Sequence, residues 1–277
     1  MNGAQMSPRH APWGESHDFQ IGLKPIAAGD WLEGGEADPA ARKDALFAGP
    51  RGLVWAETEG SRAAQAEALA MVEAALGAQI EAGDRPPLWA AARVVPDDLC
   101  LMQKIAGEWR LTALSLSAGG FFTAEDAIGK SLGDLHGPVS GFAERFLVRV
   151  QRIFEGLRPG LLLERRNWTL LNGEQLHTPF SGPIRARVGA IAPGEAGQVL
   201  HTGVERQTLR RLPESGAALF TIRVWLAPLA MLAGERWRLA TFARAWRAAS
   251  PELRACKRLD LYDDLVEGFL AGEGVGE

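Results

Sequence analysis

Histidine is the residue of this sequence best suited to metal or acid–base chemistry, and it occurs at five positions: His10, His17, His136, His177 and His201. No two of these have the i, i+4 spacing of a zinc-binding HExxH helix, and no group of cysteines and histidines has zinc-site spacing. The sequence therefore does not predict a metal held by several side chains. It remains compatible with a prosthetic group that needs one axial histidine.

His136 stands in a glycine-rich segment, residues 129–141, directly before a predicted helix. The glycines would allow a large planar ligand to approach closely, and Pro138 stiffens the segment. Two interpretations are open. His136 could ligate the metal of a prosthetic group, or it could be a loop histidine bonded to a backbone carbonyl, which is the more common arrangement.

A second group of polar residues lies on two predicted strands, residues 204–212 and 217–226. In the first strand, alternation places Glu205 and Gln207 on one face and Arg206 on the other. In the second strand, it places Arg223 on the same face as Thr221 and Trp225. One interpretation is a solvent-facing ladder of charged cross-strand pairs. The other is an arginine and a carboxylate inside a cofactor pocket.

A third group is the segment 164–168, which reads Glu-Arg-Arg-Asn-Trp. On residue type alone, Asn167 is a polar group close to a turn and Trp168 is a core aromatic residue.

The elements that must position these residues alternate between strand and helix patterns. Strands are predicted over 98–103 and 109–117, over 161–171, and over 204–212 and 217–226, where the turn Pro-Glu-Ser-Gly joins the last two into a hairpin. Helices are predicted from Ser61 onward, over 142–157, around Trp237 and Trp246, and over 251–270. Residues 22–53 are rich in Gly and Pro and are expected to be mostly loop. Sequential hairpins with helices between them predict an α+β fold.

Composition excludes several classes of protein. A net charge of −4 and a pI near 5.8 argue against a nucleic-acid binder. Cys100 and Cys256 are the only cysteines, so the chain has neither a disulfide framework nor a four-thiolate iron–sulfur site, and two scattered thiols are typical of the reducing cytoplasm. The first residues lack the apolar core of a signal peptide, and no strand is followed by a nucleotide-binding glycine motif. We expect a cytoplasmic protein with a flexible arm over 1–20, a main domain over 21–250 and a C-terminal helix and tail over 251–277.

Three segments together resemble a known family. They are Leu-His-Gly-Pro-Val-Ser-Gly-Phe at 135–142, Arg-Arg-Asn-Trp at 165–168, and the long block at 204–229 that begins Val-Glu-Arg-Gln-Thr-Leu-Arg-Arg-Leu-Pro. The sequence is similar over residues 20–250 to the alpha subunit of haem-dependent oxidative N-demethylase and its mostly uncharacterised relatives. The resemblance implies a PAS-like fold, in which an antiparallel sheet with flanking helices encloses a haem pocket.

The resemblance also implies a reaction. It is the oxidation of a small secondary amine such as dimethylamine by O₂ at haem b, with monomethylamine and formaldehyde as products. The electrons would come from NADPH through FMN and a 2Fe-2S cluster. Two cysteines cannot ligate such a cluster, so these carriers would lie on partner subunits.

Carried onto this sequence, the resemblance makes His136 the ligand of the haem iron. Arg206 and Arg223 become groups over the open face of the haem or partners of its propionates, and Arg223 would stabilise charge that develops on bound O₂. Glu205 would orient an ammonium substrate. The implied cofactor-binding residues are thus His136, Asn167, Trp168 and Arg206, and the implied catalytic residues are Glu205 and Arg223.

Two further functions fit the same sequence. A PAS-like haem protein could be a gas or redox sensor, or a relative that binds a ligand without turnover, because a fold alone does not fix function. The chain could also be an interaction subunit whose arginine-rich strands meet an acidic partner.

Overall fold

An antiparallel sheet forms the centre of the computed structural model, which describes residues 11–14, 21–137 and 143–276. In this part of the chain the sheet has seven strands in the order β1-β5-β6-β7-β3-β4-β2. The strands are β1 (Lys24–Pro25), β2 (Trp55–Glu57), β3 (Asp98–Ile105), β4 (Glu108–Ser115), β5 (Leu162–Leu171), β6 (His201–Arg211) and β7 (Ala218–Pro228). The predicted α+β class with an antiparallel sheet is confirmed.

Both predicted hairpins are confirmed. β3 and β4 are joined at Ala106 and Gly107, which both have positive φ, and β6 and β7 are joined by the four residues that follow Leu212, with φ at Gly216 also positive. The β6–β7 register places Arg206 directly opposite Arg223. Directly paired residues lie on the same face of a sheet, so the predicted alternation of this hairpin is confirmed as well.

Helices connect and cover the strands. They are α1 (Pro39–Phe47), α2 (Arg51–Val54), α3 (Arg62–Leu76), α4 (Pro87–Val94), α5 (Ala124–Ala127), α6 (Leu132–Leu135), α7 (Val148–Gly156), α8 (Ser181–Ala186), α9 (Ala196–Val199), α10 (Arg236–Ala248), α11 (Pro251–Lys257) and α12 (Asp263–Gly272). A π-helical turn, Ala143–Leu147, precedes α7. The helices predicted from Ser61 onward, over 142–157 and around Trp246 are confirmed within the described residues.

Two expectations about helices are wrong. Residues 22–53 were expected to be mostly loop, but α1 and α2 occupy much of the second half of this segment. The Asp38 side chain accepts the backbone N–H of Ala41 (3.0 Å), and Pro39 suits a first helical turn. The segment 251–270, expected as one helix, is divided. Arg258 adopts a left-handed conformation (φ 52°), which ends α11 and leaves α12 to start five residues later.

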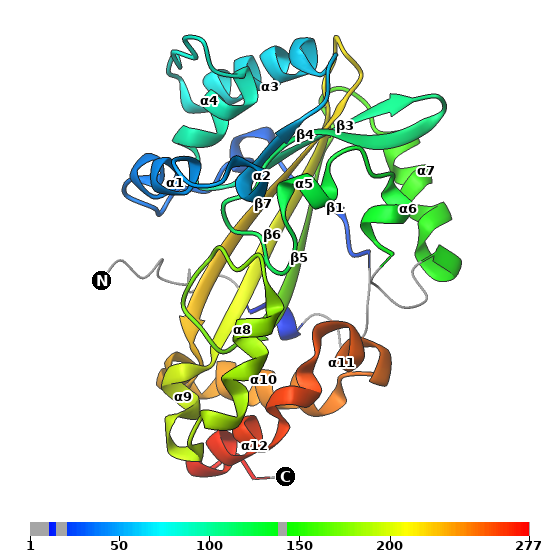
Figure 1. Cartoon of the computed structure of the whole chain (residues 1–277). Helices are drawn as coiled ribbons and strands as arrows, with labels where there is room; N and C mark the ends of the chain where they lie inside the picture. Colours follow the sequence, from blue (N-terminus) through cyan, green and yellow to red (C-terminus); the bar gives the residue numbers. More distant parts are fainter. Residues whose placement is uncertain (1–10, 15–20, 138–142, 277) are drawn as a thin grey trace.

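The two faces of the sheet are covered differently, and we name them by this difference. The closed face carries Arg166, Arg206 and Arg223. In the orientation of Figure 1, the upper half of this face packs against α1, α3 and α4. Its lower half packs against α10 and the helices that follow it. The open face carries Arg165 and Glu205. Its upper half packs against α5, α6 and α7. Figure 1 shows α1, α3 and α4 on one side of the strands and α6 and α7 on the other.

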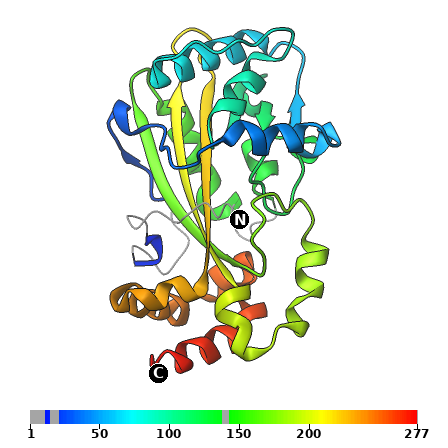
Figure 2. The ribbon, with the colours of Figure 1, turned by 90° about the vertical axis from the view of Figure 1, so that its left-hand side faces the viewer.

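The long strands β5, β6 and β7 run from the upper helices down to the C-terminal helices, as Figure 2 shows. The apolar core at their lower end includes Trp168, Val204 and Trp225, together with residues of α10, α11 and α12. Trp13 is fully buried in the same core, where its ring packs against those of Trp168 and Phe242. Residues of the predicted N-terminal arm and of the predicted C-terminal segment thus share a core with the sheet.

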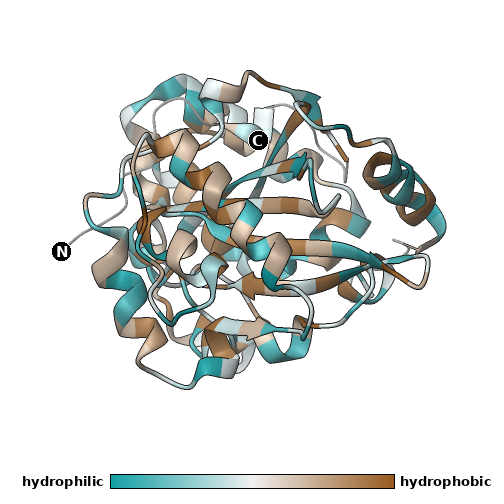
Figure 3. Ribbon diagram, turned by 90° about the horizontal axis from the view of Figure 1, so that it is seen from above, coloured by the Kyte–Doolittle hydropathy of each residue, from teal (hydrophilic) through white to brown (hydrophobic). Residues whose placement is uncertain are grey.

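Figure 3, seen from above and coloured by hydropathy, shows both hydrophobic and hydrophilic segments along the strands. Within the described ranges no helix combines the length and apolarity needed to cross a bilayer.

Candidate functional site

His136 follows directly after α6, a single helical turn fixed by a capping box. In this box Ser131 and Asp134 each accept the other's backbone N–H. The Nδ1 atom of His136 lies 2.8 Å from the carbonyl oxygen of Leu132. A carbonyl oxygen can only accept, so Nδ1 carries the hydrogen and the lone pair of the neutral ring is at Nε2. Metal-bound histidines characteristically donate their second ring nitrogen to such a partner.

The surroundings of His136 favour its neutral form. Burial lowers the pKa of its imidazole, the bond to Leu132 opposes this shift, and the nearby charge of Arg165 adds to it. A neutral imidazole is the form that can ligate a metal. Arg165 belongs to β5, so its charge acts on His136 from the open face of the sheet. The rest of the sequence motif, residues 138–142, lies outside the described residues.

The open face carries a connected polar group next to this histidine. Arg165 Nε donates to Gln207 Oε1 (2.7 Å), and Gln207 Nε2 donates to Glu205 Oε2 (2.8 Å). Asn167 stands directly opposite Glu205 in the β5–β6 register, and Lys257 Nζ donates to Asn167 Oδ1 (2.8 Å). We call these five residues the open-face cluster.

The cations of the open-face cluster are poorly solvated. Burial lowers the pKa of the Arg165 guanidinium, and burial lowers the pKa of Lys257 to about 8, although the Glu205 charge raises it. Among the described residues, the side chains that accept directly from these two cations are the neutral amides Gln207 and Asn167. A buried cation that lacks a directly bonded carboxylate is well suited to bind the anionic group of a ligand.

Lys257 was missed by the sequence analysis. It is the last residue of α11 and reaches the outer edge of β5, where it also bonds the backbone carbonyl of Trp168 and lies over its ring. Asn167 and Lys257 are 90 positions apart in the sequence. The one available signal was that lysine is rare in this chain, at five positions, but rarity alone does not place a side chain.

Arg206 and Arg223 lie on the closed face. Arg206 is 1% exposed, its Nε lies 2.5 Å from Glu164 Oε2, and its Nη atoms donate to the backbone carbonyls of Asp30 and Trp31. Arg223 is equally buried, and its Nη1 lies 3.0 Å from Glu36 Oε2. Both guanidinium groups are thus engaged in ion pairs behind the sheet.

The structure therefore brings only part of the predicted site together. His136, Glu205 and Asn167 lie on the open-face side of the sheet, whereas Arg206 and Arg223 lie on the closed face. Trp168 also points to the closed face, into the core that contains Trp13 and Phe242. Strand alternation causes this separation, because each closed-face residue is next in sequence to one that faces the other way.

The remaining histidines have different surroundings. His201 Nδ1 lies 3.0 Å from the backbone carbonyl oxygen of Val199. The half-buried ring of His177 has no hydrogen-bond partner among the described residues. Burial lowers its pKa, the charge of Asp98 raises it, and the charge of Arg42 lowers it. His10 and His17 lie outside the described residues.

The two thiols are not placed to act as ligands or nucleophiles. Cys100 is buried and Cys256 is half-buried, and burial raises the pKa of each thiol. Among the residues that the structure describes, no three His, Cys, Asp or Glu side chains converge on a metal position.

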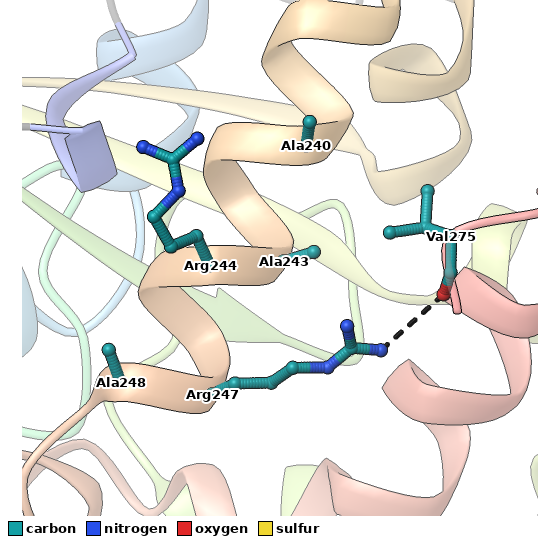
Figure 4. Close-up of a pocket in the computed structure, with 6 residues that line it drawn as sticks. All are labelled: Ala240, Ala243, Arg244, Arg247, Ala248 and Val275. Carbon is teal, nitrogen blue, oxygen red and sulfur yellow. Dashed lines mark hydrogen bonds between the residues drawn. The ribbon is translucent and has the colours of Figure 1, made fainter. Parts of the chain in front are cut away.

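A pocket of about 470 Å³ lies elsewhere, between α10 and the C-terminal tail. It is lined by Ala240, Ala243, Arg244, Arg247, Ala248 and Val275. Figure 4 shows that Arg247 points to the carbonyl oxygen of Val275, which it reaches at 3.4 Å. None of the lining residues belongs to the open-face cluster, and the pocket offers no titratable group besides arginine.

Comparison with known protein families gives a match over most of the chain. Residues 42–267 match the family described as "Haem-dependent oxidative N-demethylase, alpha subunit-like". The chain belongs to this family. The matched range contains His136, the whole open-face cluster and six of the seven strands within the described residues. The family description names a haem-dependent oxidative enzyme and one subunit of a larger assembly.

Proposed function

We propose that this chain is the haem-binding subunit of an oxidative N-demethylase that acts on a small secondary amine such as dimethylamine. The observations that carry the proposal are the family match over residues 42–267, which includes His136, and the bond of His136 Nδ1 to the carbonyl oxygen of Leu132, which makes Nε2 the basic nitrogen of the neutral ring beside the open face. The overall reaction is dimethylamine + O₂ + 2 electrons + 2 protons → monomethylamine + formaldehyde + water. In the alternative proposal, the same site binds haem for sensing.

The residues on the open face fit haem b. His136 Nε2 would ligate the iron, and the desolvated cations Arg165 and Lys257 would hold the propionates. The half-buried apolar side chains Ile222 and Val224 share this face and would contact the macrocycle. Bound haem would supply the redox-active iron at which O₂ is reduced and the amine oxidised.

Glu205 is the group proposed to bind the substrate. A secondary amine is protonated near neutral pH, and a half-buried carboxylate is a natural partner for a small cation. Gln207 holds one oxygen of Glu205, which fixes the carboxylate and leaves Oε1 to receive the N–H of the ammonium. Asn167, directly opposite in the register, would limit the position of the substrate from the neighbouring strand.

For Arg206, Arg223 and Trp168 we propose a supporting role behind the sheet. Arg206 ties β6 to Glu164 of β5 and to the segment before α1, and Arg223 ties β7 to Glu36 of the same segment. These bonds would keep the strands that carry Glu205 and Gln207 in register. The side chains would then act on the site through the backbone rather than by contact with haem or O₂.

The electron supply is proposed to come from partner subunits, with NADPH as the source and FMN and a 2Fe-2S cluster as carriers. The family description as an alpha subunit supports the existence of other subunits. The two cysteines of this sequence, Cys100 and Cys256, are too few to hold such a cluster. We further propose that the complex works in the cytoplasm, where the two thiols stay reduced.

The test is formaldehyde release from dimethylamine by the haem-loaded protein with a surrogate reductant. We expect Glu205→Gln to raise the KM for the amine roughly tenfold or more, since a charge-assisted hydrogen bond contributes about 1.5–3 kcal/mol, while the haem spectrum is retained. Glu214→Gln, in the exposed β6–β7 turn, is the matched control and should behave as wild type. Stable O₂ binding without product from any amine would favour the sensor function instead.

A further inference from the structure

Asp97 and Asp98 are adjacent, equally buried carboxylates with opposite hydrogen-bonding states. Each is 1% exposed. Asp98 accepts hydrogen bonds from the backbone N–H of Ser117 (2.6 Å), the hydroxyl of Ser117 (2.7 Å) and the backbone N–H of Ala118 (3.0 Å). Neither carboxylate oxygen of Asp97 has a hydrogen-bond partner in the described part of the chain. An ionised or polar group buried in this way costs several kcal/mol unless something else bonds it.

Arg223 presents matching donors to this carboxylate. Asp98 stands opposite Ile222 in the β3–β7 register, so the next position along the antiparallel pair brings Asp97 beside Arg223 on the closed face. Nε and Nη2 of Arg223 have no hydrogen-bond partner among the described residues, although Nη1 lies 3.0 Å from Glu36. Arg223 is also the strongest charged influence on Asp97. No direct hydrogen bond joins the two side chains.

Lys43 of α1 supplies a third polar group. It is fully buried, and its Nζ donates to the backbone carbonyls of Asp97 (2.6 Å) and Ala92 (2.8 Å). An ammonium group has three hydrogens, so one remains for a further acceptor. The bond to the Asp97 backbone carbonyl places the ammonium close to residue 97, and the charges of Asp98, Arg42 and Asp97 all act on it.

The charges of this region decide which ligand fits. An anion would be repelled by the Asp97 carboxylate, and a metal ion would be repelled by the cations of Arg223 and Lys43. A small neutral molecule that both donates and accepts hydrogen bonds suits all three groups. We propose that Asp97, Arg223 and Lys43 form a buried water-binding site, in which at least one ordered water donates to the Asp97 carboxylate and accepts from Arg223 Nε or Nη2.

Such a site would join three parts of the chain. Asp97 directly precedes β3, Arg223 is in the central strand β7, and Lys43 belongs to α1. The water would complete the polar layer that also contains the Arg223–Glu36 pair, and so would attach α1 and the segment before it to the centre of the sheet. The inference concerns the closed face and does not depend on haem or on the proposed function.

The test is a crystal structure of the protein at a resolution that shows ordered water, for wild type and two variants. We expect a water within about 3.2 Å of both an Asp97 carboxylate oxygen and an Arg223 side-chain nitrogen. Asp97→Leu should remove this water, and the matched neighbour Asp98→Asn should retain it. A direct Asp97–Arg223 hydrogen bond, an ion in the site, or no density between the two groups would overturn the proposal.

A measurement in solution covers the case in which Asp97→Leu does not fold. The NMR signal of Arg223 Nε–H should show a cross-relaxation peak with long-lived water in wild type and in Asp97→Asn, because an amide can still bond the water. The expected result is a peak of similar intensity in both proteins. Its absence from wild type would contradict the site.

Discussion

The two faces of the sheet hold their arginines in opposite ways, although the residues concerned are neighbours in the sequence. On the closed face Arg206 and Arg223 are paired directly with the carboxylates Glu164 and Glu36. On the open face Arg165 is bonded to the neutral Gln207, and Lys257 to the neutral Asn167. The first arrangement neutralises each charge within the protein. The second orients the cations and leaves their charge for a ligand.

In our proposal the arginines of the closed face stabilise the fold, and the cations of the open face bind a ligand. A buried ion pair is costly to form, but it is much more costly to lose one partner of an existing pair. Substitutions of these residues on the closed face should therefore lower the folding stability of the protein. The open face should be sensitive mainly in its affinity for an anionic ligand. The predictions below test this distinction.

The largest effect is expected on the closed face. Arg206→Ala leaves the buried Glu164 with Arg166 as its remaining partner and removes the donors to the carbonyls of Asp30 and Trp31, so we expect the free energy of unfolding to fall by about 3–5 kcal/mol. Urea titration of the haem-free protein measures this change. The matched open-face variant Arg165→Ala should lose far less stability, since Gln207 is neutral. Equal losses in the two variants would contradict the distinction between the faces.

The second effect concerns ligand affinity on the open face. Arg165→Met and Lys257→Met should each weaken haem binding about 10- to 100-fold, because a hydrogen bond to a charged group contributes about 1.5–3 kcal/mol. A haem titration followed by absorbance gives the dissociation constants. Arg258→Met changes the exposed neighbour of Lys257 and should leave the affinity unchanged. If both open-face variants bind haem with wild-type affinity, the proposal that Arg165 and Lys257 hold the haem propionates is contradicted.

The third effect is a pH dependence of stability from the closed face. Burial raises the pKa of Asp97 to about 6, while the cations Arg223, Lys43 and Arg206 lower it and Asp98 raises it. Between pH 4 and pH 6 the Asp97 carboxyl group therefore stays protonated in the folded protein, whereas it has lost its proton in the unfolded chain. Its contribution makes stability decrease as the pH rises through that range, by an amount on the order of 2 kcal/mol.

The check for this prediction is the difference between the unfolding free energies of wild type and Asp97→Asn, measured from pH 4 to 8. The difference should change between pH 4 and 6 and be constant above pH 6. A constant difference over the whole range would show that Asp97 does not titrate there.

The smallest effect is a pH dependence of ligand affinity from the open face. Lys257 has a pKa lowered to about 8 by burial, so its charge is present below that pH and lost above it. We expect haem affinity to fall by up to about tenfold per pH unit above pH 8. Lys257→Arg keeps its charge and should remove this dependence. Identical pH profiles in wild type and Lys257→Arg would exclude Lys257 as an anion partner.

The sequence predicted local features of the fold and site more fully than distant ones. The β6–β7 hairpin and its alternation are set by a four-residue turn and by neighbours two residues apart, so the opposite directions of Glu205 and Arg206 could be foreseen. The pairing of Arg206 with Glu164 depends on the β5–β6 register, and the contact of Lys257 with Asn167 depends on how α11 docks. Neither is encoded in a short window of sequence.

The same limit explains why Arg206 and Arg223 were grouped with Glu205. Residue type marked all three as polar groups on central strands, and the resemblance suggested a polar pocket. Alternation already separated them, but the presence of buried carboxylate partners on the closed face became visible only in three dimensions. Glu36, which pairs with Arg223, comes from a segment 187 positions away.

The most direct test of the central claim, that the open face binds haem through His136, is a haem titration of wild type, His136→Ala and His177→Ala. We predict the Soret band of a histidine-ligated haem in wild type and in His177→Ala. In His136→Ala this spectrum should be lost and restored by added imidazole. A wild-type spectrum in His136→Ala, or its loss in His177→Ala alone, would contradict the account.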